Sequence, residues 1–483
     1  MFGTSVRSTA RLIAGFFALT VAWMVTLPLF AGPDEPANFI KSAAVVRGQL
    51  VGESIPASVS TSFWSTYVDI DSRFGTAQLV PWCFVGQPQT PACSAPLQTL
   101  TPVEPARTDM GRYPPIGFMP AGLGTLIGPS DAGARAARLT GAVTCCAMLA
   151  VAAQLLRRRN RSIVPLLIAA TPGVLFLSSV SSPSGLEIAS ALTAWTALWL
   201  GIHERWSQRS TLGVFVAASS LLIVARPAGL IAVAVMVLCA ALADHTSLRG
   251  ALVRHWRQFA ALGGAIAVSL GWYLTAYSHN FDVRLEVDTR ITKVSTIVSK
   301  SLIDLPRLVT ESVGNFGWLD TPSPTVAVWI FVALTAAAAW RTLRIATTRQ
   351  RLALAVVTLS VPLWHFALNA NYQDLLGTFG SQGRHITPLL VGIPLAAVMH
   401  HTSRKSDRTL TALMLFVHAW CVLVALRRYA SGSGGNDLLG FITNPTWSPP
   451  LGMPLTLIVV AGAHLGAWFG LQEVRSSAGR MER

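Results

Sequence analysis

Long apolar runs without charge recur along the whole chain, and this feature constrains the fold more than any other. A run of about 17 to 25 such residues crosses a bilayer as one helix, because a helix satisfies its own backbone hydrogen bonds where water is absent. Of the 483 residues, 52% are hydrophobic and only 12% are charged. The sequence therefore predicts an all-α polytopic membrane protein.

Twelve candidate spans can be placed along the sequence, with boundaries that are approximate by several residues. The basic residues lie in short bursts between alternate spans, so the net charge of +15 indicates orientation in the membrane rather than nucleic-acid binding. This pattern predicts that both termini are cytoplasmic. The spans cover residues 12–31, 133–156, 162–182, 185–202, 211–225, 227–243, 258–278, 326–340, 352–370, 386–402, 409–426 and 452–470.

These spans divide the chain into five parts. We expect a first transmembrane helix, retained as an anchor, then an extracytoplasmic loop that contains an amphipathic helix, a disulfide-closed cap and a re-entrant segment. Spans two to seven, a second extracytoplasmic loop, and spans eight to twelve with a cytoplasmic tail follow. The five parts are residues 1–31, 32–132, 133–278, 279–325 and 326–483.

Two adjacent acids, Asp34 and Glu35, follow the first span. Pro36 favours the start of a helix over residues 36–47, which would lie along the membrane surface. In one interpretation an acid caps this helix. In the other, Asp34 is a general base that takes a proton from an acceptor hydroxyl, while Glu35 orients it or helps to hold a divalent cation such as Mg²⁺, Mn²⁺ or Ca²⁺. The two interpretations can hold together, because one acid can cap while the other faces a cleft.

Arginines are less expected in short outer segments, yet Arg112, Arg226 and Arg384 are all predicted there. A guanidinium grips phosphate through two hydrogen bonds, so these residues are candidate ligands for the phosphate of a lipid. His385 is a weaker candidate, because a histidine beside a helix start is more often structural. The alternatives are snorkelling of Arg226 to the interface and an ion pair of Arg384 with Asp374.

Cys83 and Cys93 lie ten residues apart in the first outer loop. In an oxidising exterior we expect them to pair, which would stabilise the cap by about 2 to 3 kcal/mol, although two free thiols are the alternative. The four other cysteines lie in spans and are expected to serve as small apolar packing residues.

Several motifs occur in a fixed order along nearly the whole chain, and the order carries a resemblance. They are Gly-Pro-Asp-Glu-Pro, Val-Val-Arg-Gly-Gln, the cysteine pair, Arg-Tyr-Pro-Pro, Ser-Ser-Pro at 181–183, Phe-Gly-Trp-Leu-Asp and Gly-Arg-His. This order resembles a family of polytopic bacterial membrane proteins catalogued as a domain of unknown function. That family is similar to the type C glycosyltransferases, which use polyprenyl-phosphate sugars and carry an acidic motif in the first outer loop.

The resemblance has one match and two departures. Asp34 and Glu35 match the placement of the acidic motif. Asn38 stands where family members often carry histidine. Glu187 follows the Ser-Ser-Pro turn without the aspartate that the resemblance would place soon after it.

Residues and resemblance together predict an inverting glycosyltransferase of a bacterial plasma membrane, with its active site outside the cytoplasm. It would transfer a hexose or pentose from polyprenyl phosphate to a glycan, lipid or protein of the cell envelope, with Asp34 as general base. Further candidate substrate contacts are Asn38, Tyr113, Trp318 and Asp320. A transporter or flippase of a lipid-linked substrate and a non-catalytic envelope assembly protein are the alternatives. The arginine-rich, alanine-rich composition favours an actinobacterial source and a role in cell-wall biogenesis.

Overall fold

Nine helices in the described part of the chain are long and apolar enough to cross a membrane. The structure is a computed structural model, and it describes residues 2–55, 64–93, 95–102, 104–281, 290–400, 406–434 and 439–472. The predicted all-α polytopic architecture is confirmed, while the expected cytoplasmic tail from residue 473 lies outside the described residues. The nine helices are α1 (Phe2–Thr26), α4 (Asp131–Arg158), α7 (Pro183–His203), α9 (Gly229–Arg254), α10 (Trp256–Thr275), α12 (Thr325–Ile345), α13 (Thr348–Leu376), α16 (Ser406–Ser431) and α18 (Met453–Leu471).

The three other predicted spans coincide with shorter or broken helices. One is the single helix α8 (Arg209–Ala225). The other two are interrupted near Pro172, Pro388 and Pro394, because proline lacks the N–H that continues a helix. Both broken segments are almost wholly buried in protein, as irregular backbone at membrane depth requires. They comprise α5 (Val164–Ala169) with α6 (Pro172–Leu177), and α14 (Gly383–Leu390) with α15 (Gly392–Leu395) and the 3-10 helix η5 (Ala396–Met399).

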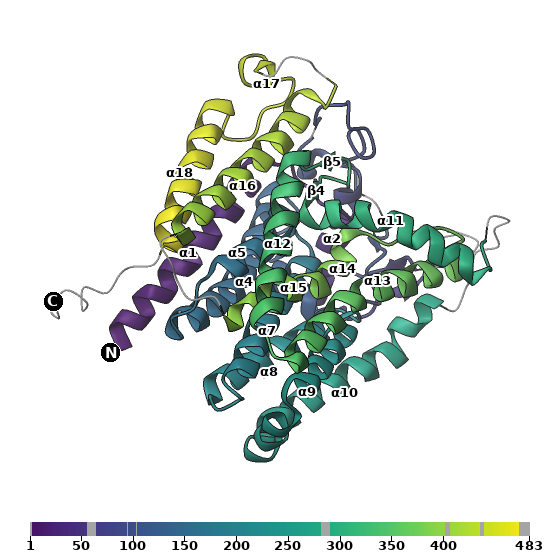
Figure 1. Cartoon of the computed structure of the whole chain (residues 1–483). Coiled ribbons are helices and arrows are strands. Elements are labelled where there is room, and N and C mark those ends of the chain that lie inside the picture. The colour runs from purple at the N-terminus through teal and green to yellow at the C-terminus, as the bar shows by residue number, and fades with distance from the viewer. Residues whose placement is uncertain are drawn as a thin grey trace.

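Helix α7 lies at the centre of the bundle, and its whole apolar window is buried. It packs against α4, α8 and α9 (Figure 1). On the left of Figure 1, α1, α16 and α18 pack together, and α1 also packs against α4. On the lower right lie α9, α10 and α13, and α10 is the least buried of the nine helices, so its surface faces lipid.

The first outer loop folds into a small cap that covers helix α2 (Glu35–Val45). Three short strands form an antiparallel sheet in the order β1 (Glu53–Ser54), β2 (Thr66–Tyr67), β3 (Arg107–Thr108). The helical pieces of the cap are η1 (Ser72–Gln78), η2 (Leu97–Thr99), η3 (Pro115–Phe118) and α3 (Met119–Thr125). The last two occupy the position of the expected re-entrant segment, and α3 packs against α2 and α4.

Helix α2 differs from the expected surface helix. It begins at Glu35, so that Pro36 is its second residue, and every residue except Ala37 is buried. The prediction of a helix on the membrane surface was wrong, because the cap and α3 cover the side that was expected to face water or lipid. The helix is instead an internal element that fixes the residues at its start.

The second outer loop supplies the helix that lies over the start of α14. It begins with η4 (Tyr277–Phe281), continues as α11 (Val294–Gly314) and ends in a hairpin of β4 (Asn315–Phe316) and β5 (Thr321–Pro322). Helix α11 packs against α13 and α14, as Figure 1 shows on the right. The last outer loop carries the short helix α17 (Gly440–Thr443).

Candidate functional site

Asp34 and Arg384, which are 350 residues apart in sequence, form an ion pair beside the starts of α2 and α14. Asp34 lies between α1 and α2 in the left-handed conformation, with φ 56°, and its side chain does not cap α2. Instead, Arg384 Nη2 donates a hydrogen bond to Asp34 Oδ2 at 2.6 Å. The Asp34 side chain is 38% exposed and that of Arg384 only 10%. A reactant can therefore reach the carboxylate while the protein holds the arginine.

Glu35 has a different environment from its neighbour. Its side chain is 1% exposed and forms a buried ion pair with Arg138, whose Nε and Nη2 donate to the two carboxylate oxygens at 2.7 and 2.8 Å. The same two oxygens also accept the backbone N–H groups of Gly32 and Ser181 at 2.9 and 3.0 Å. Four donors occupy both oxygens, so the structure argues against the catalytic and cation-binding role given to Glu35. This carboxylate holds the Asp34 loop against α4 and the start of α7.

The segment that carries Arg384 is fixed by side chains of α11 and α13. Glu311 Oε2 accepts the backbone N–H of Gly383 at 2.7 Å. Arg307 Nη2 donates to the carbonyl of Ser381 at 3.0 Å, and Trp364 Nε1 donates to the carbonyl of His385 at 3.1 Å. These contacts on both sides of Arg384 set the direction in which its guanidinium reaches Asp34.

An aromatic cavity of about 450 Å³ lies beside this ion pair. Four of the six tyrosines of the chain line it, together with Trp364. His385, the residue next to Arg384, also lines the cavity, which places the ion pair close to it. The tyrosines are Tyr113, Tyr273, Tyr277 and Tyr372, and the polar lining residues include Glu187, Arg226, Asn371 and His385.

The mouth of this cavity is apolar and lies on lipid-facing helices. Ile231 of α9 is 41% exposed, and Leu270 of α10 is 45% exposed. Both line the cavity, and exposed apolar side chains on membrane-spanning helices face the acyl chains. A ligand with an apolar tail can therefore enter from the bilayer and place its polar end among the tyrosines.

Arg226 lines this cavity and contacts side chains of α7, which argues against the snorkelling alternative. Its Nη1 donates to Ser184 Oγ at 2.6 Å, its Nε lies 3.5 Å from Glu187 Oε2, and its guanidinium carbon lies 5.5 Å from the centre of the Tyr113 ring. The break between α8 and α9 at Pro227 places the side chain there. Arg226 thus supplies a positive charge, partly balanced by Glu187, at the polar end of the cavity.

The other predicted site residues are distributed around the cap. Arg112 donates to Ser54 Oγ and Asn280 Oδ1 at 2.7 and 3.3 Å, which joins the cap to the residues just beyond α10. Trp318 Nε1 donates to the carbonyl of Phe30 at 3.0 Å, and so attaches the hairpin loop to the Asp34 loop. Asn38 is 2% exposed, and its Oδ1 has no hydrogen-bond partner within the described ranges.

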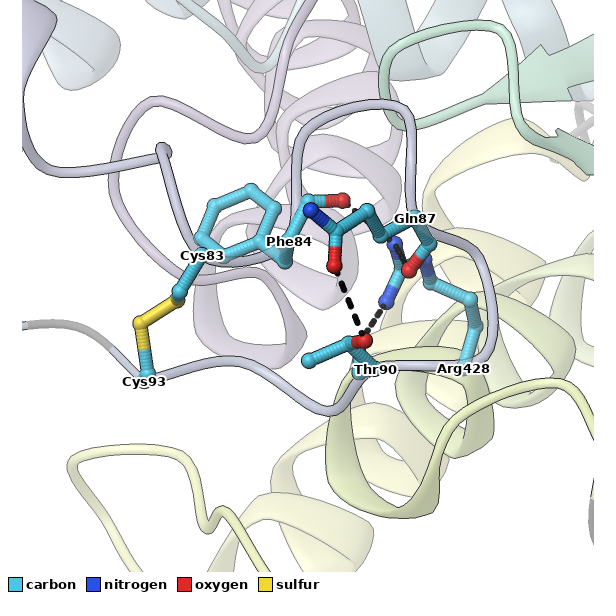
Figure 2. The surroundings of a disulfide bond; sticks show 6 residues. All are labelled: Cys83, Phe84, Gln87, Thr90, Cys93 and Arg428. Atoms are coloured by element: carbon cyan, nitrogen blue, oxygen red, sulfur yellow. Dashed lines mark hydrogen bonds between the residues drawn. A yellow bond between two sulfur atoms is a disulfide. The ribbon is translucent and has the colours of Figure 1, made fainter.

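Asp320 belongs to a cluster that fixes the disulfide loop. Cys83 and Cys93 are bonded, and the loop between them wraps around Arg428 of α16 (Figure 2). This buried arginine donates to the carbonyl groups of Phe84 and Thr90 at 2.9 and 2.6 Å, to that of Gln87 at 3.1 Å, and to Asp320 Oδ2 at 2.8 Å. The cluster ties the cap, α16 and the β4–β5 hairpin together, so Asp320 serves the structure of the cap.

The family of the chain follows from a match over most of its length. A family model described as "Predicted membrane protein (DUF2142)" matches residues 17–393, which include Asp34, Arg226 and Arg384. The chain belongs to the DUF2142 family. No curated protein matches it.

Two solved structures resemble this DUF2142 protein along nearly its whole length. They are crystal structures of ArnT from Cupriavidus metallidurans, one bound to undecaprenyl phosphate and one in the apo state. Both have 15% sequence identity and a TM-score of 0.45, and the matches cover 94% and 93% of this chain and 75% and 73% of those chains. We transfer no residue role from this likeness.

The proposed divalent cation does not fit the acids of this DUF2142 protein. Glu35 has both oxygens occupied by four donors, and Asp34 faces the guanidinium of Arg384, whose positive charge opposes a second cation. Within the described residues, no group of three or more histidines, cysteines, aspartates or glutamates is gathered for a metal. No step below therefore involves a metal ion.

Sequence reasoning missed several residues of the site in this DUF2142 protein. Glu187 was noted only as a departure from the resemblance, although an acid inside a membrane span is by default a candidate functional residue. That signal could have identified it. The tyrosines at 273, 277 and 372 carried no comparable signal. Tyrosine is common at membrane interfaces, because its amphipathic ring sits at the level of the lipid headgroups.

Proposed function

We propose that this protein is an inverting glycosyltransferase that takes a sugar from a polyprenyl-phosphate donor and transfers it to an acceptor outside the cytoplasm. One observation carries the proposal above all: the exposed carboxylate of Asp34, held by Arg384, lies beside an aromatic cavity that opens toward lipid. The long apolar tail of such a donor needs the opening toward lipid, and its polar head needs the cavity beside the carboxylate.

The cavity suits the head group of such a donor. Sugar rings present apolar C–H faces that pack on aromatic rings, while their hydroxyls need donors and acceptors, which Glu187 and Asn371 offer. About 450 Å³ lies within the range of sites that hold small ligands. The lipid tail would leave past Ile231 and Leu270 into the bilayer.

The donor phosphate would lie against Arg226. The contact between Arg226 Nε and Glu187 is long, at 3.5 Å, so a phosphate oxygen can compete with Glu187 for the guanidinium. Arg384 is the second candidate, because its Nε is buried and has no hydrogen-bond partner within the described residues. Both arginines stay charged at physiological pH and would stabilise the leaving phosphate as negative charge develops on it.

The reaction would be a single displacement. Asp34 accepts the proton of an acceptor hydroxyl, and the hydroxyl oxygen attacks the anomeric carbon of the donor sugar. The bond between that carbon and the phosphate oxygen breaks, and the polyprenyl phosphate leaves with the electron pair. The anomeric configuration is inverted, and the proton later passes from Asp34 to water. Arg384 holds the carboxylate in place through its hydrogen bond to Asp34 Oδ2.

The test uses purified protein in lipid vesicles and a labelled polyprenyl-phosphate sugar. We expect the wild type to transfer the label, and Asp34→Asn to reduce the rate about 100-fold to 10,000-fold, which is the usual contribution of a general base. The matched control is Asp71→Asn, which changes a cap aspartate paired with Arg73 and should leave the rate unchanged. Undiminished transfer by Asp34→Asn would remove Asp34 from the role of base. Movement of the labelled donor across the vesicle membrane without sugar transfer would show that the protein is a carrier and not an enzyme.

A further inference from the structure

A second cavity borders the segment that precedes Arg384. It measures about 530 Å³ and is bordered by α11, the hairpin loop and the segment before α14. Five of its nine lining residues are charged or polar, and Phe379 is its one aromatic lining residue. The lining residues are Lys300, Ile303, Asp304, Arg307, Leu319 and residues 379–382.

Two walls of this second cavity are attached to the Asp34 loop. Leu319 follows Trp318, whose Nε1 donates to Phe30, four residues before Asp34. Gln382 lies two residues before Arg384, which donates to Asp34 itself. His385, the residue after Arg384, lines the aromatic cavity. The chain on either side of Arg384 therefore contributes to both cavities.

The chemistry of the second cavity favours a ligand with many hydroxyl groups. The hydroxyl of Ser381 is buried, and it has no hydrogen-bond partner within the described part of the chain. Arg307 offers donors and Asp304 offers acceptors, and a sugar hydroxyl uses both. Phe379 supplies an aromatic face, with the Nζ of Lys300 at 5.5 Å from its ring centre.

The charges around this cavity balance. Lys300 and Arg307 are positive, while Asp304 and Glu311 are negative, and Arg307 forms ion pairs with both acids. An anionic ligand would therefore gain little net attraction, because the guanidinium is already neutralised by two carboxylates. An uncharged ligand that accepts and donates hydrogen bonds suits this balance of charge.

We propose that the second cavity binds the acceptor, and that the acceptor is an uncharged, hydroxyl-rich saccharide. One sugar ring lies on Phe379, and its hydroxyls contact Ser381, Asp304 and Arg307. The next ring presents a hydroxyl to Asp34 past Gln382. This inference rests on the proposed function for the transfer step, whereas binding of a saccharide can be measured without it.

The binding test uses the exposed amine of Lys300, which lies over the ring of Phe379. Wild-type protein is treated with a membrane-impermeant acylating reagent in the presence of millimolar methyl glycosides, and the modified peptide is quantified by mass spectrometry. We expect the methyl glycosides to slow acylation of Lys300 at least threefold, and expect no protection in Phe379→Ala. Protection by phosphorylated glycosides alone, or by none, would overturn the proposal.

The kinetic test separates acceptor from donor. Phe379→Ala and Ser381→Ala should each raise the KM for a methyl glycoside acceptor about tenfold, the loss expected for one stacking contact or hydrogen bond. The Kd for the labelled donor should stay within twofold of wild type. The control Trp82→Ala removes an aromatic ring that is 66% exposed just before the disulfide loop, and should change neither constant. An unchanged KM, or an equal loss of donor affinity, contradicts the acceptor site. Protection of Lys300 in a protein that never turns over the donor would instead refute the proposed function and leave a saccharide-binding site.

Discussion

The different roles of the two adjacent acids can be tested by mutation. Glu35 is assigned to the stability of the fold and Asp34 to the reaction. In Glu35→Gln the shape of the side chain is kept, but one oxygen becomes an amide that donates. That amide then faces N–H groups of Arg138 and of a backbone amide, which are donors themselves. Two of four hydrogen bonds are lost, and Arg138, which is 2% exposed, keeps a buried charge without its counter-ion.

The magnitude follows from this geometry. Removing one partner of a buried ion pair costs about 3 to 5 kcal/mol, because the charge that remains is desolvated and uncompensated. At roughly 2 °C per kcal/mol in a large chain, the midpoint of thermal unfolding should fall by roughly 5 to 10 °C. The matched variant is Asp34→Asn, whose carboxylate is 38% exposed, so its ion pair contributes about 1 kcal/mol at most. It should unfold within roughly 2 °C of the wild type.

Thermal unfolding in one detergent, followed by tryptophan fluorescence, measures both variants. Transfer from the labelled donor is measured at a temperature at which Glu35→Gln is still folded. We expect the unstable Glu35→Gln to retain transfer within about tenfold, and the stable Asp34→Asn to lose it. A Glu35→Gln protein as stable as wild type but without activity would refute the division of roles. The double variant Glu35→Gln with Arg138→Gln should lose less unfolding stability than the two single variants lose together, since neither partner of the buried ion pair remains charged.

Three further predictions concern the cap and the aromatic cavity. Lys41 donates to two backbone carbonyl groups at 2.6 and 2.7 Å, and burial lowers its pKa from 10.5 to about 7. The unfolded chain therefore binds the extra proton between pH 7 and pH 10.5, so stability should rise with pH across this window by up to about 1.4 kcal/mol per pH unit. Urea unfolding of wild type and Lys41→Met at several pH values checks this, and an equal slope in both proteins would contradict it. Arg428→Lys should lower unfolding stability by about 2 to 4 kcal/mol and speed reduction of the disulfide, because lysine cannot reach three carbonyl groups and Asp320 together. Mass spectrometry after timed reduction measures the rate of disulfide reduction. An unchanged rate would show that Arg428 does not stabilise the disulfide loop. Tyr277→Ala should weaken donor binding about tenfold while Tyr67→Ala in the cap does not, and equal affinities would exclude the aromatic cavity as the donor site.

The membrane architecture could be predicted because each span is a local property of the sequence. All twelve predicted segments coincide with helices, including the two that proline breaks into shorter pieces. The disulfide was predictable for a similar reason, since ten residues close a loop easily. Helix α2 was misplaced because its burial depends on the cap, which no periodicity within residues 36–47 reveals.

The candidate site was predictable only in part. The sequence placed Asp34, Arg226 and Arg384 at the outer face, since acids and arginines at span boundaries are rare and conspicuous. It could not pair Arg384 with Asp34, because that contact joins segments 350 residues apart. It could not separate Asp34 from Glu35 either, because the partner that removes Glu35 from chemistry, Arg138, lies within what reads as an uninterrupted membrane span.

The anomeric configuration of the product tests whether transfer is a single displacement assisted by Asp34. Wild-type protein in vesicles is given an anomerically defined polyprenyl-phosphate sugar and an acceptor glycoside, and the anomeric proton coupling of the new bond is measured by NMR. A single displacement assisted by Asp34 predicts a product of inverted configuration that is absent with Asp34→Asn. A product of retained configuration, or an inverted product formed equally well by Asp34→Asn, would contradict the account.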